Sequence, residues 1–415
     1  MKILLYLALP LFVFAQSYDL KTLINHANTH NGLIKAKELN IKAKQQEVNA
    51  AESAYWPTVD MGANHSYVSP ATIVSPGQVS SAFATLGMEL YDGGRKSAVL
   101  RGKYFEHEAS LFEKSAFEKS VILEIVRRYY DVKKLKAILQ ALGERSNELH
   151  AQIGRVGKFN EAGLSTSEEV DKLRAVYDNN DYTIANTKLA LATSEENLEL
   201  LSGLSAKNLK NNYFKEPKNI QFEVFENTKI LQANANAVGE NANAISAGYE
   251  PHVSVSDTYT KSHFDDTVSS PGFDQGNFLL DHQNKLMFSV NMRLFDNGKM
   301  SKESEAVRYQ KMALLSQSEH SKKEQIMNFK LAQKSLQTMR TKLKSANSAL
   351  KAVKSTYGVM LQKFEAGLSD NIAYLDALAE RTLTQARYQE TLYDYEISKS
   401  IYYYYAGKNP KEFIR

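Results

Sequence analysis

The sequence predicts an α+β membrane protein made of two tandem structural repeats, each with two barrel strands and a very long α-helical hairpin. Three observations predict this fold. The segment Lys158 to Ser165 recurs, with one residue fewer, as Lys363 to Ser369. Each copy separates two long proline-free runs that are rich in helix-forming residues. Ahead of each hairpin, apolar and polar residues alternate with the period of two that is typical of β-strands.

The composition limits the classes of function. The chain has 415 residues, 24% of them charged, and a formal net charge of +4. So small a net charge of mixed sign does not favour nucleic-acid binding, and we expect no nucleic-acid partner. The sequence has no cysteine, which excludes disulfides, thiolate metal sites, a cysteine nucleophile and a lipid anchor on cysteine.

The N-terminus has the pattern of a secretory signal peptide. Lys2 precedes an apolar run from Ile3 to Phe14, and Val13-Phe14-Ala15 fits a small-x-small cleavage site. We therefore expect a signal peptide over residues 1–15 and a mature chain that starts near Gln16. A membrane anchor is the alternative, but the apolar run of about a dozen residues is shorter than the roughly 20 that a spanning helix needs.

A first repeat is expected over residues 16–216, and it opens with a helix at residues 18–56, where apolar residues recur at roughly helical spacing. Asn31-Gly32 is a weak point in this helix. Tyr55-Trp56-Pro57 ends it, because the residue before a proline is disfavoured in the α conformation.

The period then changes to two, which predicts strands at about 58–68 and 81–91. Two proline-free runs follow, from Arg95 to Phe159 and from about Ser167 to Leu201, on either side of a tip at 158–165. The first of these runs, roughly 65 residues at 1.5 Å each, predicts a helix of about 100 Å. A helix of that length needs lateral partners.

A second repeat, expected over residues 217–415, follows the same order. Its first helix ends at Tyr249-Glu250-Pro251, and alternation predicts strands at about 252–261 and 285–295. A second very long helix leads to a tip at 363–369, and a last helix follows. The fourth strand is expected to have one apolar face, formed by Leu286, Phe288, Val290, Met292 and Leu294.

The spacing of the two repeats indicates one ancestral unit. Tyr91-Asp92-Gly93-Gly94-Arg95 corresponds to Phe295-Asp296-Asn297-Gly298-Lys299, and Asp296 lies 204 positions after Asp92. Gly367 lies the same 204 positions after Gly163. The long helix between strand and tip therefore has the same length in both repeats.

Four strands with one apolar face suit a membrane barrel but cannot close one. An open edge in lipid leaves backbone groups unpaired, at several kcal/mol each. The barrel must therefore be shared between chains, and three chains would give twelve strands, an even number within the range of known barrels.

In their order and spacing these motifs resemble the TolC-like outer membrane efflux proteins, over essentially the whole mature chain. The shared features are Tyr-x-Pro before the outward strands, aromatic-Asp-x-Gly-Arg/Lys after the return strands, the Gly-Leu-Ser tips and the aromatic segment Tyr393 to Gly407. The resemblance implies a homotrimer with a 12-stranded barrel in the outer membrane and a periplasmic α-helical tunnel. It also implies a passive, porin-like efflux channel that works with a periplasmic adaptor (membrane fusion) protein and an inner-membrane pump of RND or ABC type.

The resemblance implies that the two tips dock the adaptor. A glycine there supplies the left-handed backbone that ends a helix, and the serine after it is expected to cap the next helix. Ordinary helix-hairpin turns without a partner are the alternative. The candidate docking residues are Gly163, Leu164, Ser165, Gly367, Leu368 and Ser369.

The family's periplasmic entrance is held by polar contacts and carries rings of aspartate, which favour cations. The match is partial, because Ala373 stands where the family often has the first of two aspartates. Solvated helix surface or charges favoured by the helix dipole are the alternative. The candidate gate or pore-lining residues are Asp376, Asp370, Glu169, Asp171 and Arg174.

No motif in the sequence predicts an enzyme, and we expect no cofactor or bound metal. His26 and His30 are four residues apart, but no third ligand lies near them in the sequence. The alternative to a channel is a secreted coiled-coil scaffold or adhesin, which would have no need of the four alternating strands. The sequence leaves open the cargo, which could be drugs, metal ions, bile salts or a polypeptide, and the class of pump.

Overall fold

The computed structural model describes residues 17–218, 220–268 and 279–415, so the expected signal peptide lies outside the described residues. The chain forms two compact units. The first unit comprises Met1–Lys37, Lys114–Glu226 and Ser321–Arg415. The second unit comprises Glu38–Glu113 and Asn227–His320.

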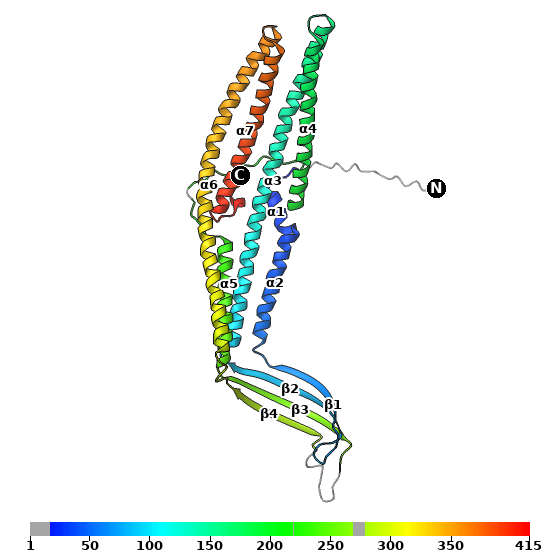
Figure 1. Cartoon of the computed structure of the whole chain (residues 1–415), viewed down its shortest axis with the longest axis vertical. Helices are drawn as coiled ribbons and strands as arrows, with labels where there is room; N and C mark the ends of the chain where they lie inside the picture. The colour runs from blue at the N-terminus through cyan, green and yellow to red at the C-terminus, as the bar shows by residue number, and fades with distance from the viewer. Residues whose placement is uncertain (1–16, 219, 269–278) are drawn as a thin grey trace, which may run out of the picture. The chain divides into compact units, whose positions relative to one another are not determined.

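The second unit contains one four-stranded antiparallel sheet in the order β1-β2-β3-β4 (Figure 1). Its strands overlap the four segments in which the sequence alternates. They are β1 (Thr58–Tyr67), β2 (Gln78–Asp92), β3 (His252–Asp265) and β4 (His282–Asn291).

The pairing register separates the sheet into an apolar and a polar face. Val59 lies opposite Leu86 and Met61 opposite Ala84, so these side chains share one face. Val59 and Met61 are 69% and 83% exposed, so the described residues do not cover this face with a core. The polar face has hydroxyl pairs across β2 and β3, one of which joins Thr85 to Thr258 at 3.0 Å.

The fourth strand ends earlier than its alternation predicts. We expected it to reach residue 295, but β4 ends at Asn291, opposite His252 at the start of β3. Pro251 precedes His252 and has no N–H to continue the ladder. Residues 292–295 therefore have no strand partner on the β3 side.

Two helices that start in the second unit begin beside an aspartate of the repeated motif, which is Asp92 in the first copy and Asp296 in the second. The carboxylate of Asp92 accepts hydrogen bonds from the backbone N–H groups of Gly94 and Lys96 at 3.1 and 2.7 Å. Asp296 accepts from Lys299 and Met300 at 3.1 and 2.9 Å. Both aspartates thus satisfy free N–H groups in the first turn of a long helix.

The two very long helices have the same length. Both α3 (Arg95–Glu161) and α6 (Lys299–Glu365) contain 67 residues, and both run through the two units. The first unit also contains α4 (Ser167–Ser202) and α7 (Asn371–Tyr405), which complete two hairpins, α3–α4 and α6–α7 (Figure 1). The equal lengths follow from the equal spacing of the motifs.

The predicted first helix is two helices. α1 (Leu20–His30) and α2 (Gly32–Ser53) are separated at Asn31, the weak point expected from the sequence. The remaining helix is α5 (Glu226–Ser246). None of the helices among the described residues is both long and apolar enough to cross a lipid bilayer.

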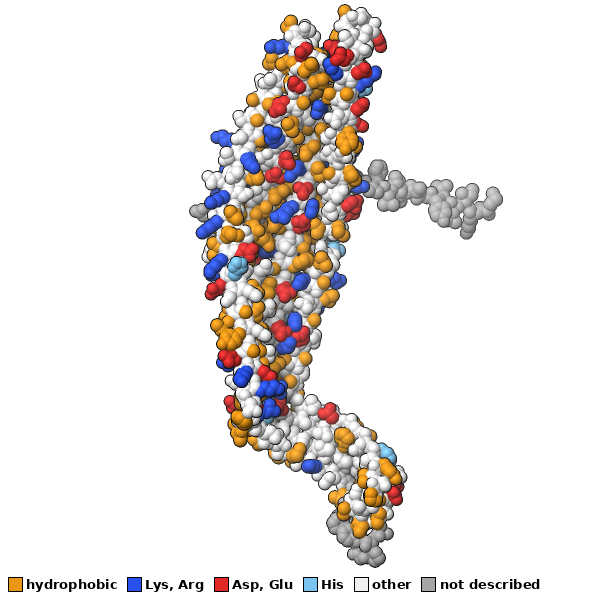
Figure 2. Space-filling model, viewed as in Figure 1, with side chains coloured by type: hydrophobic (Ala, Val, Ile, Leu, Met, Phe, Trp, Pro, Cys, Tyr) orange, Lys and Arg blue, Asp and Glu red, His pale blue; other side chains and the backbone are white. Residues whose placement is uncertain are grey.

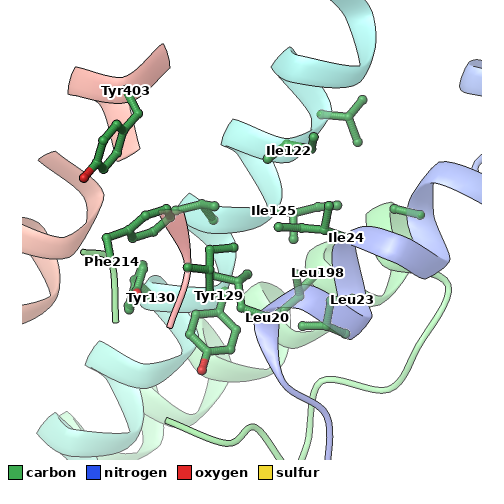
Figure 3. Close-up of a cluster of buried hydrophobic side chains, with 14 of the residues drawn as sticks. Leu20, Leu23, Ile24, Ile122, Ile125, Tyr129, Tyr130, Leu198, Phe214 and Tyr403 are labelled. Atoms are coloured by element: carbon green, nitrogen blue, oxygen red, sulfur yellow. The ribbon is translucent and has the colours of Figure 1, made fainter. Parts of the chain in front are cut away.

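The main core of the first unit lies where α1 packs against the middle of α3 (Figure 3). Aromatic rings from the connector after α4 and from α7 extend it, and Tyr129 and Tyr130 meet edge to face with their centroids 5.1 Å apart. Its buried side chains include Leu20, Leu23, Ile24, Ile122, Ile125, Tyr129, Tyr130, Leu198, Phe214 and Tyr403.

A buried ion pair fixes the connector onto α7. Lys399 and Glu396 lie 2.6 Å apart, and both side chains are only 4% exposed. Glu396 accepts a hydrogen bond from the backbone N–H of Phe214, and Lys399 donates to the Phe214 carbonyl and to Glu216. Burial raises the pKa of Glu396 despite these contacts.

The surface of the helices is mixed in charge but has exposed apolar residues. Figure 2 shows acidic and basic side chains interspersed along the helices, with apolar side chains between them. In the first unit, α4 exposes Tyr182, Leu189 and Leu200 by 68%, 70% and 82%. In the second unit, α6 exposes Tyr309 and Met312 by 62% and 60%. Such apolar residues at helical spacing mark faces that other helices cover.

We expect Lys399→Met to lower the stability of the first unit by about 3–5 kcal/mol, because it leaves a buried carboxylate without its partner. Lys134→Met is the matched control, since it removes a more exposed ion pair with Asp394 at 2.7 Å, which should contribute about 0–1 kcal/mol. Thermal unfolding followed by circular dichroism measures both. Adding Glu396→Gln to the first variant should restore part of the loss, and equal losses for the two lysine variants would contradict this assignment.

Candidate functional site: the two hairpin tips

The two tips are turns of equal length in the first unit. Five residues, 162–166, separate α3 from α4, and five residues, 366–370, separate α6 from α7. Their sequences are Ala-Gly-Leu-Ser-Thr and Ala-Gly-Leu-Ser-Asp. The two turns therefore share Ala-Gly-Leu-Ser and differ only in their last residue, Thr166 or Asp370.

The same hydrogen bonds end both incoming helices. Gly163 has a φ of +74°, and its N–H donates to the carbonyl of Asn160 at 3.0 Å. Leu164 donates to the carbonyl of Phe159 at 2.7 Å, which completes a Schellman motif. In the second tip, Gly367 has a φ of +71° and donates to Phe364, and Leu368 donates to Lys363. A glycine is needed because other residues are strained at positive φ.

These turns hold a leucine in solvent at each tip. Leu164 is 76% exposed and Leu368 is 78% exposed. Each follows a glycine in the left-handed conformation, so the backbone hydrogen bonds of the turn fix its position. A large apolar side chain held outward at corresponding places in two copies of a turn can bury itself only against another molecule.

The predicted capping role of the two serines is wrong. The N-caps are the next residues, Thr166 and Asp370, which accept hydrogen bonds from Glu169 N–H at 3.4 Å and from Ala373 N–H at 2.8 Å. The Schellman turn uses the glycine and the leucine, and the serine is one further residue between that turn and the N-cap. Ser165 instead donates to the Glu169 carboxylate, and Ser369 donates to a methionine sulfur at 3.2 Å.

A cavity of about 570 Å³ lies between the two tips. Arg155 on α3 and Glu365 on α6 form an ion pair of 3.3 Å beside it. The other lining residues include Val156, Phe159, Leu164, Ser165, Glu169, Phe364, Gly367, Ser369 and Asp370. The two tips thus form one surface with apolar walls and polar groups at its edge.

Two of the five candidate gate residues take part in helix capping. Asp370 is the N-cap of α7, and Glu169 is the third residue of α4, where its carboxylate accepts from Ser165. Thr166 and Glu169 have the spacing of a capping box. The carboxylates of Asp370 and Glu169 therefore have local structural roles beside any role in a pore.

The other three candidates are exposed. Asp171 and Arg174 lie one turn apart on α4 and form an ion pair of 3.8 Å, with side chains 72% and 64% exposed. Asp376 is exposed on α7, and Ala373, one turn earlier, is half-buried. The structure brings Asp171 and Arg174 together and leaves Asp376 pointing away from the core of its own chain.

The sequence did not reveal a polar contact that joins the two hairpins below the tips. Arg381 on α7 and Glu148 on α3 lie 2.6 Å apart, and the Arg381 guanidinium lies 4.2 Å from the centre of the Tyr357 ring on α6. The Tyr357 hydroxyl donates to Glu148, and burial together with this bond raises the pKa of Tyr357. Three helices distant in sequence contribute these groups, so no linear motif signals them.

The fold is that of bacterial outer membrane channels. The structure superposes on CusC with a TM-score of 0.79 and 15% identity, covering 94% of this chain and 92% of CusC. VceC of Vibrio cholerae gives a TM-score of 0.78 and 14% identity, with 94% and 96% of the chains covered. The CmeC outer membrane channel of Campylobacter jejuni gives 0.78 and 15%, with 94% and 85% covered.

The family model described as "Outer membrane efflux protein" matches residues 23–204. No match is found among curated protein sequences. The resemblance to outer membrane efflux proteins, first seen in the strand-end and tip motifs, is thus confirmed by the family model over residues 23–204. The fold agrees with it over almost the whole chain.

We expect Gly163→Ala to lower stability by about 1–2 kcal/mol, because alanine is strained in the left-handed conformation at this turn. Gly157→Ala is the matched control. Gly157 lies six residues earlier in the interior of α3, with open space around the position of a new Cβ, so alanine there should add about 0.5–1 kcal/mol. Thermal unfolding should therefore shift in opposite directions. Shifts of the same sign would show that the turn does not depend on glycine.

Proposed function

We propose that this protein is a homotrimeric outer membrane channel-tunnel. It gives export substrates a passive path from a periplasmic adaptor and an inner-membrane pump to the outside of the cell. The single observation that carries the proposal is the four-stranded sheet, whose apolar face is exposed and whose two edge strands lack an outer neighbour among the described residues.

The sheet supports a shared barrel. Backbone N–H and C=O groups cannot stay unpaired in hydrocarbon, so β1 and β4 each need another strand. Three copies supply twelve strands, with the apolar face in contact with lipid and the polar face towards a wet interior. Hydroxyl pairs such as Ser81 with Ser262 then line the passage.

The helices support a tunnel that continues this barrel in the periplasm. Exposed apolar residues on α4 in one unit and on α6 in the other give separate faces for neighbouring copies to cover. A secreted scaffold or adhesin would also use such helices, but it would have no use for a sheet with an exposed apolar face. The match to the outer membrane efflux protein family favours the channel.

The tips support docking to an adaptor. Corresponding turns present two exposed leucines, Leu164, which lines the cavity, and Leu368, whose neighbours Gly367 and Ser369 line it. This surface suits the tip of a helical hairpin from a partner. The pump behind the adaptor, of RND or ABC type, supplies the energy. This chain needs no catalytic group for that role.

Export should fail when Leu164 and Leu368 are both replaced by Glu, because two carboxylates cannot be buried against an apolar partner. The double Met variant is the matched control, since it keeps the apolar volume. Survival of cells on a pump substrate measures export, and site-specific crosslinking measures contact with the adaptor. Normal export by the Glu variant, with its oligomer intact, would exclude docking through these leucines.

We place Asp376 on the pore, where three copies would form an acidic ring that favours cations. Single-channel recordings in planar bilayers under salt gradients test this, with Asp376→Ala beside the unchanged protein. The expected result is a small cation-preferring current whose preference is lost in the variant.

An unchanged preference would move selectivity to Asp370, Glu169 or Asp171 and leave the channel in place. The channel itself is tested by fractionation with outer membranes and by a heat-sensitive oligomer on gels. Recovery only as a soluble monomer, with no current from the folded protein, would overturn the proposed function.

A further inference from the structure

A pocket of about 690 Å³ lies at the base of β4 in the second unit. It is open and partly apolar, and the segment that forms one wall is the stretch just after the strand. The pocket is lined by Gly248, His252, Asn291, Met292, Arg293, Leu294, Phe295 and Met300.

The sequence of this segment continues the strand although the backbone does not. Leu286, Phe288 and Val290 alternate along β4, and Met292 and Leu294 extend the same alternation beyond its end at Asn291. Met292, Leu294 and the neighbouring Phe295 are 55%, 84% and 78% exposed. Strand-like residues that lack both a strand partner and a core indicate that another chain supplies the partner.

The opposite edge of the sheet carries a matching feature. Trp56 is the only tryptophan of the chain and is 74% exposed. It precedes Pro57 and Thr58, where β1 begins, so it lies at the base of the other edge strand. No residue in the described part of the chain buries this indole ring.

Closing the barrel between copies would bring the segment after β4 close to Trp56 before β1. β1 starts at the end of the sheet where β4 finishes, so in a closed ring β4 of one copy would run antiparallel to β1 of the next, with the end of β4 and the start of β1 at the same rim. We propose that residues 292–295 of one copy pair with the start of β1 in the next copy, and that Trp56 of that next copy covers the pocket at the base of β4. This inference rests on the proposed homotrimer.

The chemistry of the pocket suits an indole ring. Burying a tryptophan removes about 150–250 Å² of surface from water. Met292 and Leu294, which share one face of the paired segment, offer apolar contacts to the ring. Tryptophan is also favoured at the interface between lipid and water, where the base of such a barrel lies.

The absence of cysteine allows a direct test. Trp56→Cys and Leu294→Cys are introduced into one chain, and the membrane-embedded protein is oxidised mildly. Because each copy would be joined to the next, the expected product is a covalent trimer that reduction converts to monomer. Either single variant should give none.

Met61→Cys with Leu294→Cys is the matched control. Met61 is 83% exposed on the same edge strand, but it lies five residues further along β1, or roughly 16 Å at about 3.3 Å per residue. That separation exceeds the reach of a disulfide. This pair should give no covalent trimer, or far less than the Trp56 pair.

Fluorescence of the single tryptophan is the second measurement. In the heat-sensitive oligomer, Trp56 should emit at shorter wavelength and resist a water-soluble quencher, and heating to monomer should reverse both effects. Leu294→Asp should increase quenching in any oligomer that still forms.

The outcomes separate this inference from the proposed function. An intact, conducting oligomer with no Trp56–Leu294 crosslink and a fully quenched tryptophan would overturn the seam contact and keep the channel. Equal crosslinking by the Met61 pair would also overturn it. A chain that forms no oligomer and passes no current would overturn both.

Discussion

Unpaired backbone at the two edges of the sheet is the constraint on which the rest of the structure depends. A four-stranded sheet in water could leave its edges to solvent, but in hydrocarbon each free N–H or C=O costs several kcal/mol. The apolar face, with Val59 and Met61 largely exposed, requires hydrocarbon or a partner. In the proposed channel, a single copy is therefore incomplete until neighbouring copies pair with its edge strands.

The strand-end motif connects this sheet to its helices. Asp92 ends β2, Asp296 lies five residues after the end of β4, and each satisfies N–H groups at the start of a 67-residue helix. A left-handed residue follows each of them. The same motif therefore starts both long helices. Both helices end at the same Ala-Gly-Leu-Ser sequence, so the two tips form the same turn and expose equivalent leucines.

Sequence periodicity was sufficient for much of this fold. Alternation located the strands, the absence of proline located the long helices, and the glycines located the tips. The serines were misassigned as caps, because the outgoing helices begin one residue later than expected and are capped by Thr166 and Asp370. The Glu148, Tyr357 and Arg381 contact could not be predicted, since it depends on how three distant helices pack.

The early end of β4 is a second difference between the sequence prediction and the structure, and its cause is different. Alternation predicted a strand to residue 295, and the chain by itself forms one only to Asn291 because β3 begins after a proline. The alternation of side chains reflects the surroundings of a segment in the functional assembly. The backbone hydrogen bonds reflect only the strands that are present in the single chain. Where the pattern runs past the ladder, the missing partner is the simplest cause. On that reasoning the four residues after Asn291 are suited to pair with a neighbouring copy. The exposed Trp56 at the other edge is the residue of that copy that they would contact.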